Sequence, residues 1–313
     1  MARILVSGSI AYDHIMNFPD LFRNHFVADK LHNINVSFNV SEHNEHFGGT
    51  AGNIAYNLKL LGEDPLIVAT TGKDFERYEK HLQKMGIVTQ SIHRSDEKST
   101  SFAYILTDQG DNQIAGFHLG AGGTPYGDVS LESTALAIIG PGNFDDMRNI
   151  PEACRRADIP FFFDPGQVIP MLPLETLQGG FKGAAAVFGN DYEFSMLAKR
   201  LGWSEKDMLT HTQTLVITLG EQGTRIVTQN GEITIAAVPA KSVIDPTGAG
   251  DSFRAGYIHS FVAGLPPKIC AQIGSTAAVY CVESAGTQEH TYTEVEFATR
   301  YESAYSEKYT LPR

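Results

Sequence analysis

The chain has 313 residues, 42% of them apolar and 19% charged, which is enough for a sizeable core in one large domain or two ordinary ones. A formal net charge of −12 argues against nonspecific binding of nucleic acid, which requires a basic surface. No apolar run is long enough to cross a membrane. The cysteines, Cys154, Cys270 and Cys281, lack a Cys-x-x-Cys pattern, and we therefore expect buried thiols in a cytoplasmic protein.

The first strand is expected at residues 4–6, where a short apolar run ends in a Ser-Gly-Ser turn. Open α/β sheets bind ligands at the carboxyl ends of their strands, and Asp13 follows this end closely. A single Asp in such a place is usually a solvated turn residue, so the position alone decides nothing.

Two separated segments, about 12–47 and 98–118, have the alternation of half-exposed strands. Residues 34–40 alternate with period two, and residues 101–106 and 113–118 flank a polar turn. We expect these segments to form a small antiparallel sheet that lies over the main body as a lid. Extra edge strands of the main sheet are the alternative.

Gly48 and Gly49 stand shortly before an expected helix at residues 53–61, whose apolar residues share one face. Adjacent glycines let a ligand approach the bare backbone. A Gly-Gly pair before a helix is weak evidence when it stands alone.

Beyond residue 62, expected strands alternate with expected helices, and no long linker, repeat or low-complexity tract interrupts them. The strands are expected at 66–70, 87–88, 136–139, 161–163, 184–188 and 215–218, and the helices at 75–85, from 145, at 191–201 and at 269–282. Asn230-Gly231 between two short runs predicts a hairpin. The pattern predicts one α/β domain, residues 1–313, with a doubly wound, mostly parallel sheet and the small lid sheet.

Polar residues follow three of these strands. Asp164 lies in an Asp-Pro-Gly sequence that is also a good turn. Asn190 and Glu193 have the spacing of a reciprocal helix cap. Thr218-x-Gly220-x-x-Gly223 is a strand–turn sequence, for which a bare β-turn is the simple interpretation.

The densest motif is Asp245-Pro-Thr-Gly-Ala-Gly-Asp251, between an apolar β-branched segment and an expected helix at 252–263. The first amides of a helix have no intrahelical partner and form its positive end, and small residues let an anion reach them. A carboxylate beside such amides suits transfer of a phosphoryl group to a hydroxyl, because the amides hold the charge and the carboxylate takes the proton. An ordinary capped helix start is the alternative.

Other motifs are missing or weak. The sequence has no Walker A motif, no Gly-x-Gly-x-x-Gly that opens the first helix, and no Gly-x-Ser-x-Gly. His43 and His46 are three residues apart in a polar loop, which is poor support for a metal site.

The motif that ends at Asp251 resembles the C-terminal signature of the ribokinase-like (PfkB) family of sugar and nucleoside kinases. The stretch from Gly48 to Asn53 resembles the family's N-terminal signature, so the resemblance spans the whole chain. It implies that Asp251 is the catalytic base and that the anion hole consists of the amides of Gly248, Ala249 and Gly250.

The resemblance implies that the substrate sugar is bound by Asp13, Gly48, Gly49 and Asn53. The two acceptor oxygens of Asp13 suit a vicinal diol. Phe102 and Phe117 are candidates for stacking on a base, which a bare sugar would not need. Ribokinases usually carry Lys after the double Gly, where this chain has Thr50, and this departure disfavours free ribose.

The resemblance also implies an ATP site formed by Asn190, Thr218, Gly220, Gly223 and Thr247. Asn190-x-x-Glu193 resembles a family motif linked to magnesium and phosphate. Glu193 and Asp164 are therefore expected near Mg²⁺, acting through water, and a potassium ion is implied near Asp245.

We therefore expect ATP-dependent transfer of phosphate to the 5′-hydroxyl of a purine nucleoside, as in an adenosine kinase, with inosine and guanosine as further acceptors. A sugar kinase of the ribokinase or fructokinase type, and a non-catalytic nucleoside or sugar sensor on the same fold, are the alternatives. The sequence leaves open whether the protein is a monomer or a homodimer.

Overall fold

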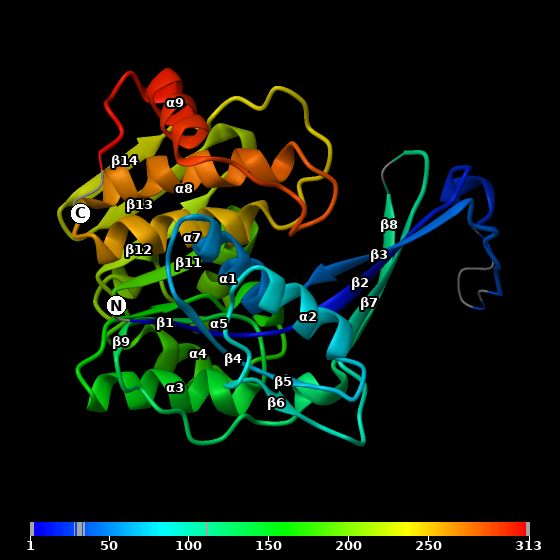
Figure 1. Ribbon diagram of the computed structural model, residues 1–313, viewed down its shortest axis with the longest axis horizontal. Helices are drawn as coiled ribbons and strands as arrows, with labels where there is room; N and C mark the ends of the chain where they lie inside the picture. The colour runs from blue at the N-terminus through cyan, green and yellow to red at the C-terminus, as the bar shows by residue number, and fades with distance from the viewer. Residues whose placement is uncertain (1–2, 28, 30–32, 34, 111, 311–313) are drawn as a thin grey trace.

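The computed structural model describes residues 3–27, 29, 33, 35–110 and 112–310. An eight-stranded sheet runs through the body with helices on both faces, and a four-stranded sheet projects from the body as an arm (Figure 1). This arrangement confirms the predicted α/β class with a large, mostly parallel sheet and a separate small sheet.

The strand order of the large sheet is β14-β13-β12-β11-β10-β9-β1-β4. Neighbours from β4 to β12 are parallel, and β13 and β14 are antiparallel, as the Asn230-Gly231 turn predicts. The strands are β1 (Arg3–Ser7), β4 (Pro65–Val68), β9 (Thr134–Ile139), β10 (Phe161–Phe163), β11 (Ala186–Asn190), β12 (Thr214–Thr218), β13 (Thr224–Thr228) and β14 (Gly231–Ile235).

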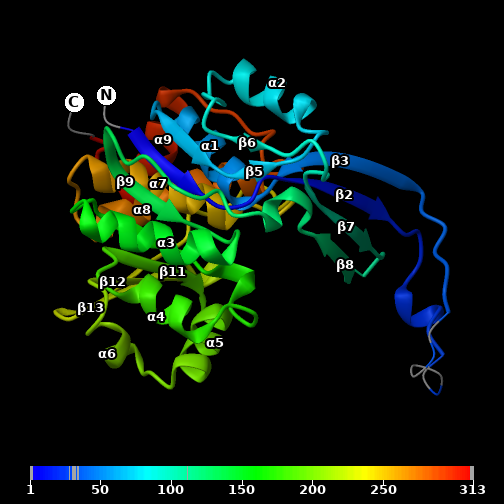
Figure 2. The same ribbon diagram turned by 90° about the horizontal axis from the view of Figure 1, so that it is seen from below.

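Helices cover both faces of this sheet (Figure 2). On one face lie α1 (Thr50–Leu60), α2 (Glu76–Lys84), α7 (Ala249–Val262), α8 (Pro267–Val282) and α9 (Glu294–Tyr305). On the other face lie α3 (Phe144–Arg156), α4 (Leu174–Phe181), α5 (Asp191–Leu201) and α6 (Glu205–Met208). Among the described residues, no helix is both long and apolar enough to span a bilayer.

Each central strand contributes to two hydrophobic cores. Phe162 of β10 packs in the core shared with α7 and α8, whereas Phe161 and Phe163 pack in the core shared with α3 and α4. Successive residues of a strand point to opposite faces, so a sheet that is covered on both faces needs apolar residues at every position. This is why the short Phe-Phe-Phe run identifies a buried strand.

The small sheet has the order β3-β2-β7-β8 and consists of β2 (Ala11–Asn17), β3 (Glu42–Gly48), β7 (Ser101–Thr107) and β8 (Gln113–His118). Only β2 and β7 pair in parallel. The register aligns Asp13, Ala103 and Phe117 across three strands, so these side chains share one face. A short parallel pair, β5 (Thr70–Thr71) and β6 (His93–Arg94), completes the strands.

The expected strand at residues 34–40 is wrong. Residue 34 lies outside the described residues, residues 35–40 form no strand, and the strand that pairs with β2 is β3. Phe38 instead packs against Phe18 and Phe22, at ring-centroid distances of 4.9 and 5.2 Å. Phe38 thus belongs to a local aromatic cluster, and period-two counting does not distinguish such packing from a strand.

Helices α7 and α8 cross where both carry a glycine. A Cβ atom placed on Gly256 would lie 2.8 Å from the Cα atom of Gly274, so the two backbones touch at this point. We expect Gly256→Ala to lower the free energy of unfolding by about 1–3 kcal/mol, because overpacking forces the helices apart.

The control is Gly179→Ala in α4, where the added methyl would have no neighbour within 4 Å. This variant should be neutral or up to about 1 kcal/mol more stable, because Ala favours the helix. Urea denaturation measures both, and equal stabilities for the two variants would contradict the packing interpretation.

Candidate active site

A cleft of about 1150 Å³ lies between the carboxyl ends of the parallel strands and one face of the small sheet. It is lined by most of the predicted site residues: Asp13, Gly49, Asn53, Phe117, Asp164, Asn190, Glu193, Thr218, Gly220, Thr247, Gly248, Gly250 and Asp251. Residues far apart in the sequence therefore converge here. Gly48, Phe102, Gly223, Asp245 and Ala249 do not line the cleft.

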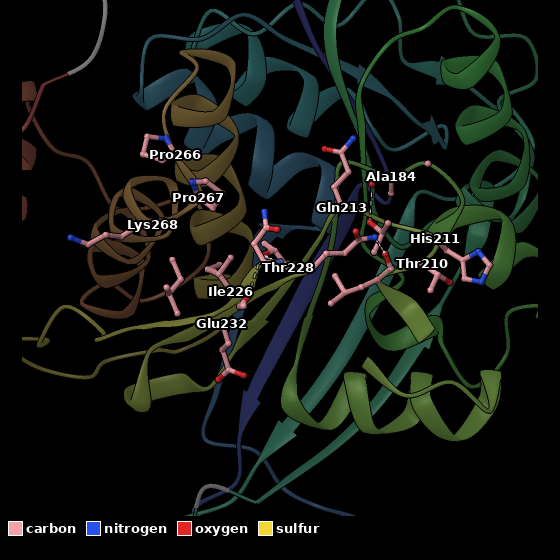
Figure 3. A pocket seen from close by; sticks show the side chains of 17 residues that line it. Ala184, Thr210, His211, Gln213, Ile226, Thr228, Glu232, Pro266, Pro267 and Lys268 are labelled. Atoms are coloured by element: carbon pink, nitrogen blue, oxygen red, sulfur yellow. Dashed lines mark hydrogen bonds between the residues drawn. The ribbon is translucent and has the colours of Figure 1, made fainter. Parts of the chain in front are cut away.

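A second hollow of about 810 Å³ lies where β11 and β12 begin, at the opposite edge of the sheet (Figure 3). Ala184, His211, Thr228 and Lys268 are among the residues that line it. No predicted site residue lines this hollow, so the cleft is the candidate active site.

The N-terminus of α7 supplies spare hydrogen-bond donors to the cleft. Gly248, with φ of 78°, precedes the helix, and its carbonyl accepts the first helical bond from Ser252 N at 2.9 Å. The Ala249 amide donates to the carbonyl of Pro246 at 3.2 Å. Among the described residues, the backbone amides of Gly248, Gly250 and Asp251 donate no hydrogen bond to any acceptor. The spare donors are thus at Gly248, Gly250 and Asp251, and the amide of Ala249 serves the turn.

Asp251 is held by Asn53 of α1, whose Nδ2 donates to Oδ2 of Asp251 at 2.8 Å. The oxygen of the Asn53 amide accepts a hydrogen bond from Gln288 Nε2 at 2.9 Å, and Thr287 Oγ1 lies 2.8 Å from the same oxygen and 2.7 Å from the carbonyl oxygen of Phe47. Because an N–H of Gln288 faces this oxygen, the amide nitrogen of Asn53 points at Asp251. The orientation of the carboxylate is therefore set by neighbours from α1 and from the loop after α8.

The two cleft carboxyls that lie nearest the expected chemistry are hard to ionise. Burial raises the pKa of Asp251 to about 6; Arg254 and the Asn53 hydrogen bond lower it, and Asp164 and Asp13 raise it further. Burial, with a smaller contribution from the charge of Asp245, also raises the pKa of Asp13 to about 6. A carboxylate with a pKa near 6 is a stronger base than an ordinary Asp and is still ionised at neutral pH.

The double glycine brings the backbone against β2. A side chain on Gly48 would collide with the carboxylate of Asp13, and Gly49 has φ of 84°, which favours glycine. The carbonyl of Gly48 also accepts a hydrogen bond from the Tyr78 hydroxyl at 2.8 Å. These contacts fix the base of the small sheet next to Asp13.

The two predicted phenylalanines lie on opposite faces of the small sheet. Phe117 aligns with Ala103 and lines the cleft, and its side chain is 52% exposed. Phe102 aligns with Tyr12 and packs against the rings of His118 and Tyr104, at 4.9 and 5.3 Å. The structure therefore brings Phe117, and not Phe102, to the site.

The polar residues at the other strand ends have structural partners. Asn190 and Glu193 form a reciprocal cap of α5. Glu193 Oε2 accepts a hydrogen bond from the backbone amide of Asn190 at 2.8 Å, and Asn190 Oδ1 accepts one from the backbone amide of Glu193 at 2.8 Å. Asp164 is 2% exposed and forms an ion pair with Arg254, whose Nη2 donates to Oδ1 at 3.0 Å. Burial, with the nearby charge of Asp164, raises the pKa of Glu193.

Two other predicted residues serve the turns beside the cleft. The carboxylate of Asp245 accepts the Thr247 amide at 2.9 Å and the Gly286 amide at 3.1 Å, which ties the motif to the loop after α8. Gly223, with φ of 96°, lies in the turn between β12 and β13, as the simple interpretation of that sequence expects.

Sequence reasoning missed Arg254 and Gln288, and it missed the contact of Thr287 with Asn53. Arg254 lines the cleft one helical turn after Asp251, and its position next to the motif was an available signal. Thr287 and Gln288 lie in a polar loop 234 and 235 residues from their partner Asn53, and no local pattern indicates that pairing.

Comparison with known proteins gives the family. The family model described as pfkB family carbohydrate kinase matches residues 1–294. The chain belongs to the pfkB family. It is an ATP-dependent kinase, and the predicted resemblance to this family is thereby confirmed.

Relatives of this pfkB-family kinase include nucleoside kinases. A nucleoside kinase of Methanocaldococcus jannaschii is 31% identical over 92% of this chain and 93% of its own length. A nucleoside kinase of Burkholderia thailandensis in complex with inosine is 35% identical, with a TM-score of 0.87 over 97% of this chain and 99% of the other. The chain of the same kinase in complex with ADP-inosine is 36% identical, with a TM-score of 0.84 over 97% of both chains.

The raised pKa of Asp251 predicts a stability cost that Asp251→Asn removes. The carboxyl is harder to ionise in the folded protein than in the unfolded chain, so ionisation destabilises the fold above pH 6. At pH 8 we expect the variant of this pfkB-family kinase to gain about 1–3 kcal/mol in the free energy of unfolding.

The gain should shrink as the pH falls from 6 to 4 and vanish below that, because the carboxyl is then protonated in both states. Urea denaturation at a series of pH values measures it. A gain that grows toward low pH would contradict the raised pKa of Asp251.

Proposed function

We propose that this pfkB-family kinase transfers the terminal phosphoryl group of ATP to the 5′-hydroxyl of a purine nucleoside. The observation that carries the proposal is the position of Asp251 beside unpaired amides at the N-terminus of α7, within a cleft that also contains Asp13. One end of the cleft suits a migrating phosphate, and the other suits a sugar.

The chemistry follows from this arrangement. The 5′-oxygen attacks the terminal phosphorus, Asp251 takes the hydroxyl proton, and the bond to the bridging oxygen breaks so that ADP leaves with the electron pair. The amides of Gly248, Gly250 and Asp251 donate to the phosphoryl oxygens, where charge redistributes in the transition state. The Asn53 hydrogen bond occupies Oδ2 of Asp251, which leaves Oδ1 for the incoming hydroxyl.

The small sheet supports a nucleoside over a free sugar. Its face toward the cleft carries Asp13, which suits the ribose diol, and beside it the apolar side chains of Ile105, Ala115 and Phe117. A purine base would cover the exposed ring of Phe117, whereas a free sugar would leave it in water. The likeness to a nucleoside kinase in complex with inosine points the same way.

The proposed ATP side of the cleft is formed by Asn190, Thr218, Gly220 and Thr247. Among the described residues, no group of three His, Cys, Asp or Glu side chains surrounds a common point. Mg²⁺ needs only one or two carboxylates when the phosphates of ATP and water supply its other ligands, so these residues fit an ion that enters bound to ATP. Glu193 would hold it through water with Oε1, because the cap uses only Oε2. When bound, the ion neutralises phosphate charge.

The proposal also includes a potassium ion beside the anion site. A potassium ion near Asp245 would help to order the turn that carries the anion site.

The small sheet, residues about 12–47 and 98–118, would act as the lid of a single domain, residues 1–313, and would exclude water from the cleft when it closes. A bound nucleoside would join the lid to the body.

A sugar kinase on the same fold is the second candidate. It is favoured by the family's description as carbohydrate kinases, and the acceptor experiment below separates the two. A non-catalytic sensor is disfavoured, because Asp251 and the unpaired amides are both in place.

The role of Asp251 as the base predicts a large effect of Asp251→Asn on turnover. We expect kcat to fall about 10³-fold, because proton removal by a positioned base contributes about 10²–10⁴-fold. ATP affinity, measured by calorimetry, should stay within about threefold, because the amides remain. Turnover near that of the wild type would refute the assignment of the base.

The identity of the acceptor is tested with a coupled assay of ADP release. We expect adenosine, inosine and guanosine to have kcat/KM values at least about 10²-fold above those of ribose and fructose 6-phosphate, because only a nucleoside buries the apolar face of the small sheet. A reaction with a free sugar alone would overturn the nucleoside assignment and favour the sugar kinase.

A further inference from the structure

Arg254 is a buried cation beside the proposed phosphate site. It lies three residues after Asp251 in α7, which places the two side chains on one face of the helix. The residue is 7% exposed and lines the cleft. Burial alone would lower the pKa of its guanidinium, but the charges of Asp164, Asp251 and Glu193 raise it, so the side chain stays cationic.

Asp164 fixes the orientation of this guanidinium. Nη2 of Arg254 donates to Oδ1 of Asp164 at 3.0 Å, and Nε forms an ion pair with Oδ2. One edge of the planar guanidinium thus faces the carboxylate, with a hydrogen bond from Nη2 and a charge contact from Nε. Asp164, expected from the sequence to act on magnesium through water, has both oxygens engaged by Arg254.

The third nitrogen of Arg254 points away from Asp164. Among the described residues, Nη1 has no hydrogen-bond acceptor. It lies beside Gly250, since a Cβ atom placed there would be 2.6 Å from Nη1. The free donor of the guanidinium is therefore next to the unpaired amides of Gly250 and Asp251, and the absence of a side chain at residue 250 makes room for it.

We propose that Arg254 is a catalytic residue whose Nη1 binds the transferring phosphoryl group, and that Asp164 is the residue that positions it. The inference rests on the proposed function, because it uses the same phosphate position. The terminal phosphoryl group of ATP passes to the 5′-oxygen, ADP leaves with the electron pair, and the hydroxyl proton passes to Asp251. Arg254 exchanges neither a proton nor a bond, and stabilises the charge on the phosphoryl oxygens throughout.

The first experiment compares Arg254→Gln and Arg254→Lys by steady-state kinetics with ATP and the best nucleoside acceptor. We expect Arg254→Gln to lower kcat about 10²–10³-fold, with the KM of the nucleoside within about threefold. Arg254→Lys keeps the positive charge but lacks the planar, forked N–H donors of the guanidinium. Its kcat should therefore be about tenfold higher than that of Arg254→Gln. A kcat within threefold of the wild type for Arg254→Gln overturns the proposal.

The matched control is Arg300→Gln. Arg300 of α9 also pairs with a carboxylate, Glu283, and is similarly shielded, with 12% of its side chain exposed, but it does not line the cleft. Its kcat should stay within about twofold of the wild type. A loss at Arg300 as large as that at Arg254 would mean that any lost Arg pair disturbs turnover, and would overturn the proposal.

Arg254→Gln leaves the Asp164 charge buried without a partner, and this can impair folding. The double variant Asp164→Asn with Arg254→Gln removes both charges and keeps the test valid. We expect Asp164→Asn alone to lower kcat about tenfold, and to add less than twofold in the Arg254→Gln background, because Asp164 acts only through Arg254. Losses that multiply would contradict that role of Asp164.

A second interpretation is that Arg254 acts only by lowering the pKa of Asp251. The carboxyl of Asp251 is faced by Arg254 of α7, Asp13 of β2, Asp164 after β10 and the neutral Asn53 of α1. At pH 9 it is ionised in every variant. The proposal predicts that the kcat loss of Arg254→Gln persists at pH 9, and disappearance of the loss there would overturn it.

Failure of this inference is distinguishable from failure of the proposed function. If Asp251→Asn abolishes turnover while Arg254→Gln stays near the wild type, the base and the acceptor stand and the role of Arg254 is wrong. If both variants turn over normally, the phosphate position itself is wrong, and both proposals fall.

Discussion

The hydrogen bond between Asn53 and Asp251 is the contact on which the rest of the site depends. It joins the first turn of α1 to the first turn of α7, from residues 198 positions apart. Both helices lie on the same face of the large sheet and begin near the carboxyl ends of its parallel strands (Figure 1). The contact therefore fixes the relative position of the expected sugar contacts and the expected phosphate site.

The surroundings of this hydrogen bond determine its direction. Gln288 donates to the oxygen of the Asn53 amide, so the nitrogen of that amide faces Asp251. Gln288 also reaches the Tyr78 hydroxyl at 2.5 Å, and Tyr78 donates to the carbonyl of Gly48 at the base of the small sheet. One buried network thus connects the carboxylate with the base of the small sheet, and such networks fix a single arrangement only when every member is satisfied.

Local sequence patterns predicted much of the fold for a physical reason. A strand buried on both faces, such as Phe161–Phe163, must be apolar throughout, and α5 begins where Asn190 and Glu193 cap it. The unpaired amides at α7 were also predictable, because Gly-Ala-Gly at the start of a helix suits an anion. These features depend on residues that are neighbours in the sequence.

Features that depend on long-range pairing were missed. Phe102 and Phe117 both belong to the small sheet, but the register of β7 with β2 decides which of them faces the cleft. Asp164 was interpreted from its own turn, although its partner Arg254 lies 90 residues away. The strand predicted at residues 34–40 failed because alternation alone does not reveal whether another strand lies alongside.

The most direct test is a crystal structure with a purine nucleoside and a non-hydrolysable ATP analogue bound together. The account predicts that the terminal phosphate lies within hydrogen-bonding distance of the amides of Gly250 and Asp251, and that the 5′-hydroxyl lies against the carboxylate of Asp251. A terminal phosphate bound elsewhere in the cleft, with Asp251 out of reach of the acceptor hydroxyl, would contradict it.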